Sequence, residues 1–194
     1  HLGKMKAVGA TSIEEVVAQT KKIPVYNGWK IGIGWYASDF GQQVLPTKED
    51  VDKASNEVPI CLIAGDAHTI WLNTKGLEEL GLTSENIPSE IGGEAVKKDG
   101  ELTGVFLEAI AIYYLSKVLA IYETESKVAL LDYMKHLNSM GITAVGDVAL
   151  TGESPDDIVY SKLYASVEDD ATVRVSFFPA MREEVEENRR LYQT

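Results

Sequence analysis

The stretch Val58–Leu82, VPICLIAGDAHTIWLNTKGLEELGL, decides how the first half of this chain folds. Its first seven residues form an apolar run, which predicts a strand buried on both faces of a sheet. Thr74 is suited to cap a following helix, and Gly81 fits the position just past the end of that helix. We therefore expect Gly65–Asn73 to be a strand-to-helix loop at the edge where α/β sheets place ligand contacts.

That loop carries several side chains that could bind a substrate or a metal ion. They are Asp66, His68, Trp71 and Asn73. A lone imidazole is weak evidence for a metal, and a histidine that holds a loop by hydrogen bonding is an equally simple interpretation of His68. Composition and spacing alone leave both interpretations open.

The residues before this stretch predict a small mixed α and β unit. Ser12 and Glu15 have the spacing of a capping box at the start of a helix that ends near Lys22. The segment Trp29–Trp35, WKIGIGW, alternates large and small residues as a strand does, and we expect both of its tryptophans in the core. Thr47 is expected to begin a short helix before the apolar strand.

The second half predicts regular alternation of helices and strands. A Gly- and Pro-rich stretch, residues 87–104, is expected to be a ribbon or linker. Helical spacing follows from Leu107 to Val118 and from Val128 to Leu137, and Gly141 is placed to end the second helix.

One βαβ crossover is expected near the end of the chain. Its strands are ITAVGDV, residues 142–148, and TVRVSFF, residues 172–178, and its helix begins at Ser154. Such units build parallel sheets, either doubly wound or closed as a (β/α)8 barrel. Periodicity does not choose between these two folds.

Composition excludes some partners and places the chain in a broad class. With 194 residues and 45% hydrophobic content, the chain can bury a substantial core. A net charge of −12 disfavours nucleic acid and anionic membrane surfaces. The single cysteine, Cys61, lies in the apolar run and is expected to be a core residue without a disulfide, which favours a cytoplasmic location.

Four segments in register resemble successive motifs of amidohydrolase family 3, the metal-dependent hydrolases that include the exoenzyme regulatory protein AepA. They are WKIGIGW (29–35), LPTKEDVDKASNEVPICLIAGDAHTIWLNTKGLEELGL (45–82), IGGEAVKKDGELTGVFLEA (91–109) and MGITAVGDVAL (140–150). The resemblance implies a fold class: α/β, an incomplete metal-dependent hydrolase (β/α)8 barrel with a mixed α+β insertion subdomain. Residues 1–100 are then the insertion subdomain, and residues 101–194 are the opening β/α units of the barrel.

The resemblance also implies a divalent metal, zinc by expectation, in the complete protein. Family members hold it with a His-x-His pair, a bridging carboxylate, two later histidines and an aspartate, and Glu108 matches the bridging carboxylate. This chain has only three histidines, His1, His68 and His136. His1 is either the tail of the His-x-His strand or a remnant of a purification tag, so we expect no metal cofactor and no catalytic residue complete within this segment.

The matching motif places His68 toward the substrate pocket, so the resemblance implies a substrate contact by His68, with Asp66 orienting its ring and Trp71 or Asn73 fixing the loop. Glu108 has a simpler interpretation as a solvated helix glutamate. His136 is expected on the surface near a helix end. Asp147 is either a residue of the barrel mouth or the cap of a turn.

Two function classes follow from these patterns. The first is a segment of a metal-dependent amidohydrolase that hydrolyses a nonpeptide carbon–nitrogen bond in a small molecule, with the isolated segment inactive. The second is a noncatalytic α/β binding or regulatory module on the same scaffold. In either class we expect a small-molecule partner and a homodimer or small oligomer of the segment, because an open barrel exposes strand edges.

Overall fold

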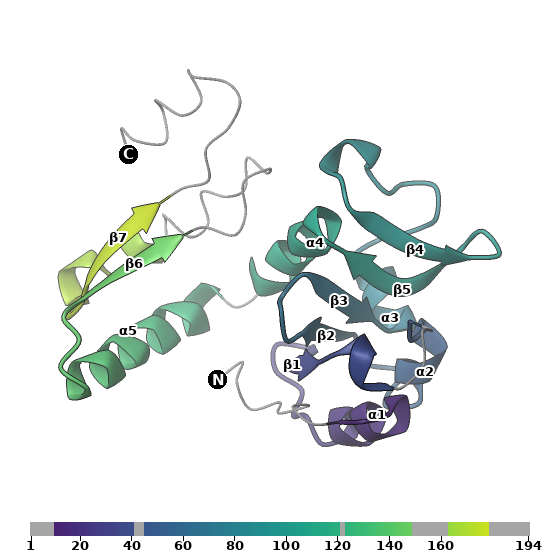
Figure 1. Ribbon diagram of the computed structural model, residues 1–194, viewed down its shortest axis with the longest axis horizontal. Helices are drawn as coiled ribbons and strands as arrows, with labels where there is room; N and C mark the ends of the chain where they lie inside the picture. Colours follow the sequence, from purple (N-terminus) through teal and green to yellow (C-terminus); the bar gives the residue numbers. More distant parts are fainter. Residues whose placement is uncertain (1–9, 41–44, 121–122, 149–162, 179–194) are drawn as a thin grey trace. The chain divides into compact units, whose positions relative to one another are not determined.

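The computed structural model describes residues 10–40, 45–120, 123–148 and 163–178 (Figure 1). The chain divides into two compact units, one through Val118 and one from Leu119 onward. The elements of the first unit, in chain order, are α1 (Ile13–Lys21), β1 (Lys30–Trp35), η2 (Ala37–Phe40), α2 (Lys48–Asp52), β2 (Ile60–Ala64), β3 (Thr69–Leu72), α3 (Thr74–Glu79), η3 (Ser89–Ile91), β4 (Glu94–Lys98), β5 (Glu101–Leu107) and α4 (Ala109–Ala120).

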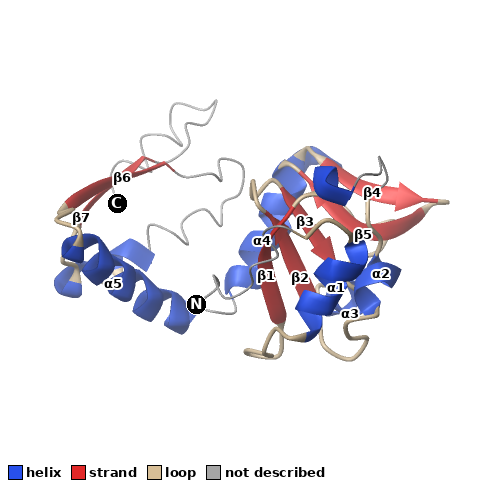
Figure 2. Ribbon diagram, turned by 60° about the horizontal axis from the view of Figure 1, so that its bottom comes forward, coloured by secondary structure: helices blue, strands red, loops and turns tan. Residues whose placement is uncertain are grey.

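The first unit is built on a five-stranded mixed sheet in the order β1-β2-β3-β5-β4 (Figure 2). β1 and β2 are parallel, whereas β2 with β3, β3 with β5, and β5 with β4 are antiparallel. Two reversals make β5 run in the same direction as β1 and β2. The carboxyl ends of these three strands therefore share one edge of the sheet, and β3 begins at that edge.

Helices cover both faces of this sheet. Val16 and Val17 of α1 and Val51 of α2 pack in one cluster with inward-facing residues of β2 such as Ile60. On the other face, Phe106 of β5 contacts Tyr114 of α4, with ring centroids 5.2 Å apart. Because both faces are covered, all five residues of β2 are buried, which confirms the prediction of a strand buried on both sides.

The expectation that Gly65–Asn73 form a loop is wrong, because β3 lies within this segment. β3 pairs with β2 as a hairpin, and only Gly65–His68 form the turn. Ile70, Trp71 and Leu72 are completely buried, so the β-branched and aromatic residues after the turn form another core strand. Asn73, rather than Thr74, is the N-cap of α3.

Several locally encoded elements are confirmed. α1 begins as predicted, with the Ser12 hydroxyl oxygen accepting from the Glu15 N–H at 3.2 Å. α2 begins at Thr47, whose backbone N–H donates to the Asp50 carboxylate at 3.0 Å. Gly81, with φ +66°, follows the end of α3. Each of these signals acts within a few residues, which is why the sequence displays it.

The predicted ribbon is a hairpin of β4 and β5, with Asp99 and Gly100 at its turn. Leu107, expected to start a helix, is instead the last residue of β5. Since β5 is hydrogen-bonded between β3 and β4, it belongs to the first unit. The two compact units consequently divide after Val118, not at residue 100 as predicted.

The aromatic core of the first unit contains the two tryptophans predicted to be buried. Trp29 and Trp35 are 3% and 1% exposed, and the ring of Trp35 meets that of Trp71 edge to face at 5.5 Å. Cys61 is also completely buried. Burial raises the pKa of its thiol to about 12, so Cys61 is a neutral core group as expected.

The second unit contains α5 (Glu123–Ser139), β6 (Ala144–Val148), η5 (Glu168–Asp170) and β7 (Arg174–Phe178). β6 and β7 pair in parallel, which confirms the parallel strands of the predicted crossover. Met134 and Leu137 of α5 pack with Val173, whereas Val128 is 56% exposed. The helix start predicted at Ser154 lies outside the described residues. Among the described helices, none combines the length and apolar character of a membrane span.

Candidate functional site

The shared strand edge of the first unit brings together His68 and Glu108. Thr69, the first residue of β3, pairs with Leu107, the last residue of β5. The next step along the ladder places His68 opposite Glu108, whose backbone N–H donates to the His68 carbonyl at 2.7 Å. Their side chains meet as well, with His68 Nδ1 2.8 Å from Glu108 Oε2. Two residues predicted for separate roles thus form one pair.

The contact with the carboxylate specifies the chemistry of the imidazole. An ionised carboxylate only accepts hydrogen bonds, so Nδ1 of His68 carries a proton and its N–H donates a hydrogen bond to Glu108. In the neutral ring, Nε2 then has a free lone pair. The side chains of His68 and Glu108 are 46% and 67% exposed, so the pair is accessible from solvent. The arrangement presents an oriented imidazole acceptor beside a carboxylate.

The backbone at this pair is strained. Within the described ranges, four non-glycine residues have positive φ: Asn27, Ala67, Asp99 and Glu108. Asn27 and Asp99 each precede a glycine in a turn, where their residue types tolerate this conformation. Ala67 and Glu108 lack that tolerance, and each costs about 1–2 kcal/mol. Because Ala67 directly precedes His68, both costs occur at the candidate pair, the kind of place where strain accompanies function.

Asp66 has a different role from the one predicted. Its carboxylate accepts from the backbone N–H of His68 at 2.9 Å, whereas the ring of His68 is held by Glu108. The turn is closed by a second bond, from the Ala67 N–H to the Ala64 carbonyl at 3.0 Å. Asp66 therefore fixes the backbone of the turn, and the residue that orients the imidazole is Glu108.

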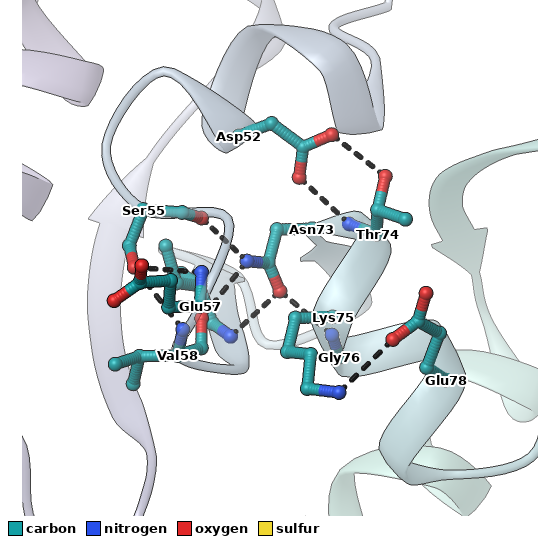
Figure 3. Close-up of polar contacts among 10 residues, drawn as sticks. Asp52, Ser55, Glu57, Val58, Asn73, Thr74, Lys75, Gly76 and Glu78 are labelled. Carbon is teal, nitrogen blue, oxygen red and sulfur yellow. Dashed lines mark hydrogen bonds and ion pairs between the residues drawn. The ribbon is translucent and has the colours of Figure 1, made fainter.

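Asn73 is a structural residue, which corrects its prediction as a substrate contact. Its side-chain oxygen accepts from the N–H groups of Ile60 and Gly76 at 2.8 and 2.7 Å. Its amide nitrogen donates to the carbonyls of Ser55 and Val58 at 2.8 and 2.9 Å (Figure 3). With the residue completely buried and both amide atoms bonded twice, Asn73 has no group left for a ligand.

The prediction that Trp71 contacts substrate is corrected for the same reason. It is completely buried, and its indole N–H donates to the Thr47 carbonyl at 2.9 Å. That bond ties β3 to the start of α2. The earlier expectation that Trp71 or Asn73 holds the loop agrees with these contacts, while a contact of either side chain with substrate does not.

The described residues do not assemble a metal site. No group of three or more His, Cys, Asp or Glu side chains among them is arranged to hold a metal ion. His68 and Glu108 supply two donors, and a hydrolytic zinc site uses three protein ligands. In the second unit, His136 is exposed beside Tyr133, and Asp147 accepts from the Tyr164 hydroxyl.

Comparison with known proteins identifies the family to which this chain belongs. The profile of amidohydrolase family 3, described as the amidohydrolase family, matches residues 5–194. The chain belongs to the amidohydrolase family. This result confirms the family resemblance seen in the four motifs, while the closer likeness to AepA stays a prediction.

This chain aligns with only part of the length of two curated relatives. An N-substituted formamide deformylase of Arthrobacter pascens is 29% identical over 150 residues, which are 74% of this chain and 27% of the relative. YtcJ of Bacillus subtilis (strain 168), named as an amidohydrolase, is 30% identical over 118 residues, 60% of this chain and 22% of the relative. The chain thus spans about a quarter of the length of each relative.

Solved structures support the fold. An uncharacterized metal-dependent hydrolase from Pyrococcus horikoshii OT3 aligns with a TM-score of 0.56 and 20% identity, covering 89% of this chain and 32% of that one. A second, from Pyrococcus furiosus, aligns with a TM-score of 0.54 and 21% identity over 89% of this chain and 33% of that one. The chain therefore shares an α/β fold with part of these hydrolases.

Proposed function

We propose that this chain is one segment of a metal-dependent amidohydrolase that cleaves an amide-like, nonpeptide carbon–nitrogen bond in a small molecule. Family membership supports the reaction class. The name of the Arthrobacter pascens relative supports the substrate class, because an N-substituted formamide is a small molecule with such a bond. In this proposal, the first unit is the mixed α+β insertion and the second contributes opening β/α units of a (β/α)8 barrel.

The observation that carries the proposal is the His68–Glu108 pair at a shared strand edge. An imidazole with its proton on Nδ1 offers Nε2 to accept a hydrogen bond from a substrate N–H or a bound water. Glu108 Oε2 contacts His68 Nδ1, and Oε1 has no hydrogen-bond partner among the described residues. Oε1 is therefore the oxygen that Glu108 would offer to a divalent cation, zinc in our proposal.

Hydrolysis needs more ligands than this pair supplies, so we assign no activity to the 194-residue chain alone. A divalent metal in the complete enzyme would polarise the carbonyl and activate water. The role of this segment is then to present His68 and Glu108 to the substrate. Binding of the small molecule and its orientation are the contributions that its own residues can make.

The test uses a longer protein that contains this sequence, loaded with zinc and assayed on an N-substituted formamide. His68→Asn and Glu108→Gln should each lower kcat/KM by roughly 100-fold, the scale of a lost acid–base or metal-orienting group. Glu94→Gln is the matched control, because Glu94 is an exposed carboxylate that pairs with Leu107 on the other side of β5. It should leave kcat/KM unchanged.

Normal activity in both site variants would remove the pair from the site. A longer protein that binds the formamide without hydrolysing it would instead favour a noncatalytic binding or regulatory module. Metal content, measured in the same preparations, separates the two roles of Glu108: a ligand role lowers metal content, and an orienting role lowers activity alone.

A further inference from the structure

Gly65 is the first residue of the turn that carries His68, and a larger residue at this position would collide with a neighbouring side chain. Its φ lies outside the left-handed region, so its backbone conformation is accessible to any residue. A Cβ built at Gly65, however, would lie 2.1 Å from Tyr36 Oη and 2.2 Å from Tyr36 Cζ. These distances are impossible for a real Cβ, so the phenol of Tyr36 occupies the place of a side chain at residue 65.

The backbone of Tyr36 is held beside this turn by hydrogen bonds, while the residue as a whole is 40% exposed. It directly follows Trp35, whose carbonyl accepts from the Gly65 N–H at 3.0 Å. The carbonyl of Tyr36 accepts from the Asp39 N–H at 3.1 Å at the start of η2. The end of β1 and the turn after β2 are thus joined by a backbone bond, and the phenol packs over the joint.

The His68–Glu108 contact does not hold this geometry alone. A solvent-exposed contact between polar side chains contributes little to stability. The left-handed conformations of Ala67 and Glu108 are both unfavourable, so the contact offsets only part of the strain around it. The bonds of Asp66 and Ala67 hold the later residues of the turn, and the phenol of Tyr36 is a side-chain contact at its first residue.

We infer that Tyr36 is a positioning residue for His68, acting through Gly65. Its ring fills the space beside the first residue of the turn and thereby keeps the His68 imidazole on Glu108. The inference rests on the proposed function, since it assigns Tyr36 to the same site. Tyr36 was not among the residues selected from the sequence.

The experiment uses the intact 194-residue chain and the ring nitrogens of its three histidines in long-range ¹H–¹⁵N NMR spectra. Spectra are recorded at about pH 8.5, roughly two units above the ordinary imidazole pKa of about 6.5. His68→Asn identifies the His68 signals. In the unmodified chain we expect the pattern of a ring protonated on Nδ1, because that nitrogen donates to Glu108.

Tyr36→Ala should weaken this Nδ1 pattern, and Gly65→Ala should weaken it to a similar extent by displacing the ring. Combining the two should cause no further loss, because Tyr36→Ala vacates the space that the new Cβ needs. Tyr36→Phe keeps the ring and should keep the pattern. The control is Tyr133→Ala, which removes an exposed tyrosine beside His136 and should alter His136 signals alone.

Backbone amide spectra of each variant establish that the sheet is intact, and Gly65→Ala carries the test if Tyr36→Ala does not fold. Retention of the Nδ1 pattern at full strength in a folded Gly65→Ala or Tyr36→Ala chain would overturn the inference. So would additive losses in the double variant. These results are independent of turnover: a longer enzyme insensitive to His68→Asn would defeat the proposed function and leave the positioning by Tyr36 standing.

Discussion

Replacing Asn73 with alanine tests whether this residue belongs to the core or to a binding site. Four hydrogen bonds end on its amide, and the residue is completely buried. Alanine removes all four and leaves their backbone partners on Ser55, Val58, Ile60 and Gly76 without this side chain. We therefore expect a large loss of folding stability.

The magnitude follows from the individual contacts. Loss of the N-cap bond to the Gly76 N–H costs about 1 kcal/mol. The Ile60 N–H is buried, so leaving it unpaired costs a further ~1–2 kcal/mol. The bonds to Ser55 and Val58 are only part-buried, so water can replace them at a smaller cost. The sum is about 3 kcal/mol, equivalent to a fall in Tm of about 10 °C for a unit of this size.

Urea unfolding followed by tryptophan fluorescence measures this effect. All three tryptophans, Trp29, Trp35 and Trp71, are buried in the first unit, so the signal reports on the unit that contains Asn73. The control is Asn86→Ala, because the Asn86 amide also bonds two backbone groups but is exposed. That change should cost less than about 1 kcal/mol.

A second substitution separates the donors of Asn73 from its acceptor. Asn73→Asp keeps the oxygen that caps α3 but turns the amide nitrogen into an oxygen facing the carbonyls of Ser55 and Val58. It should destabilise the unit at least as much as alanine does, because a buried charge also loses its hydration. An Asn73→Asp chain as stable as the unmodified one would refute the hydrogen-bond assignment and return Asn73 to the site candidates.

Three further predictions concern strain, metal and assembly. Ala67→Gly should stabilise the first unit by about 1 kcal/mol in the same urea assay, because glycine adopts a φ of +61° without strain; a loss of stability would contradict the left-handed conformation. The 194-residue chain should hold no stoichiometric zinc by elemental analysis after purification without a tag, and one tightly held metal per chain would reject this expectation. It should sediment at micromolar concentration as a homodimer or small oligomer, since β6 and β7 form a two-stranded sheet in the described residues and a net charge of −12 opposes unlimited growth; a clean monomer would speak against this assembly.

The sequence alone predicted the elements whose signals are local. Ser12 and Thr47 mark helix starts, Gly81 and Gly141 mark helix ends, and the apolar run after Val58 marks a buried strand. These signals involve residues within one or two turns of each other, so no distant contact is needed to interpret them. The strands β6 and β7 also follow local apolar patterns, and the spacing between them predicted the parallel pairing that the structure shows.

Only the tertiary structure decided the composition of the candidate site. His68 and Glu108 are 40 residues apart, and they meet because β3 and β5 pair in a register that sets Thr69 against Leu107. A shift of that register by one residue would send the side chains to opposite faces of the sheet. A single sequence does not display strand register, since register depends on the packing of both faces against helices that lie elsewhere in the chain.

Burial separated the polar residues that belong to the site from those that do not. Asp66, His68 and Asn73 are neighbours in the sequence, yet Asn73 is completely buried while the other two lie at an open turn. The sequence determined which side chains were available near the end of β2. The tertiary structure decided which of them face solvent. The Asn73 amide is enclosed by the backbone of residues 55–60 and the start of α3, whereas Asp66 and His68 lie in the exposed turn between β2 and β3.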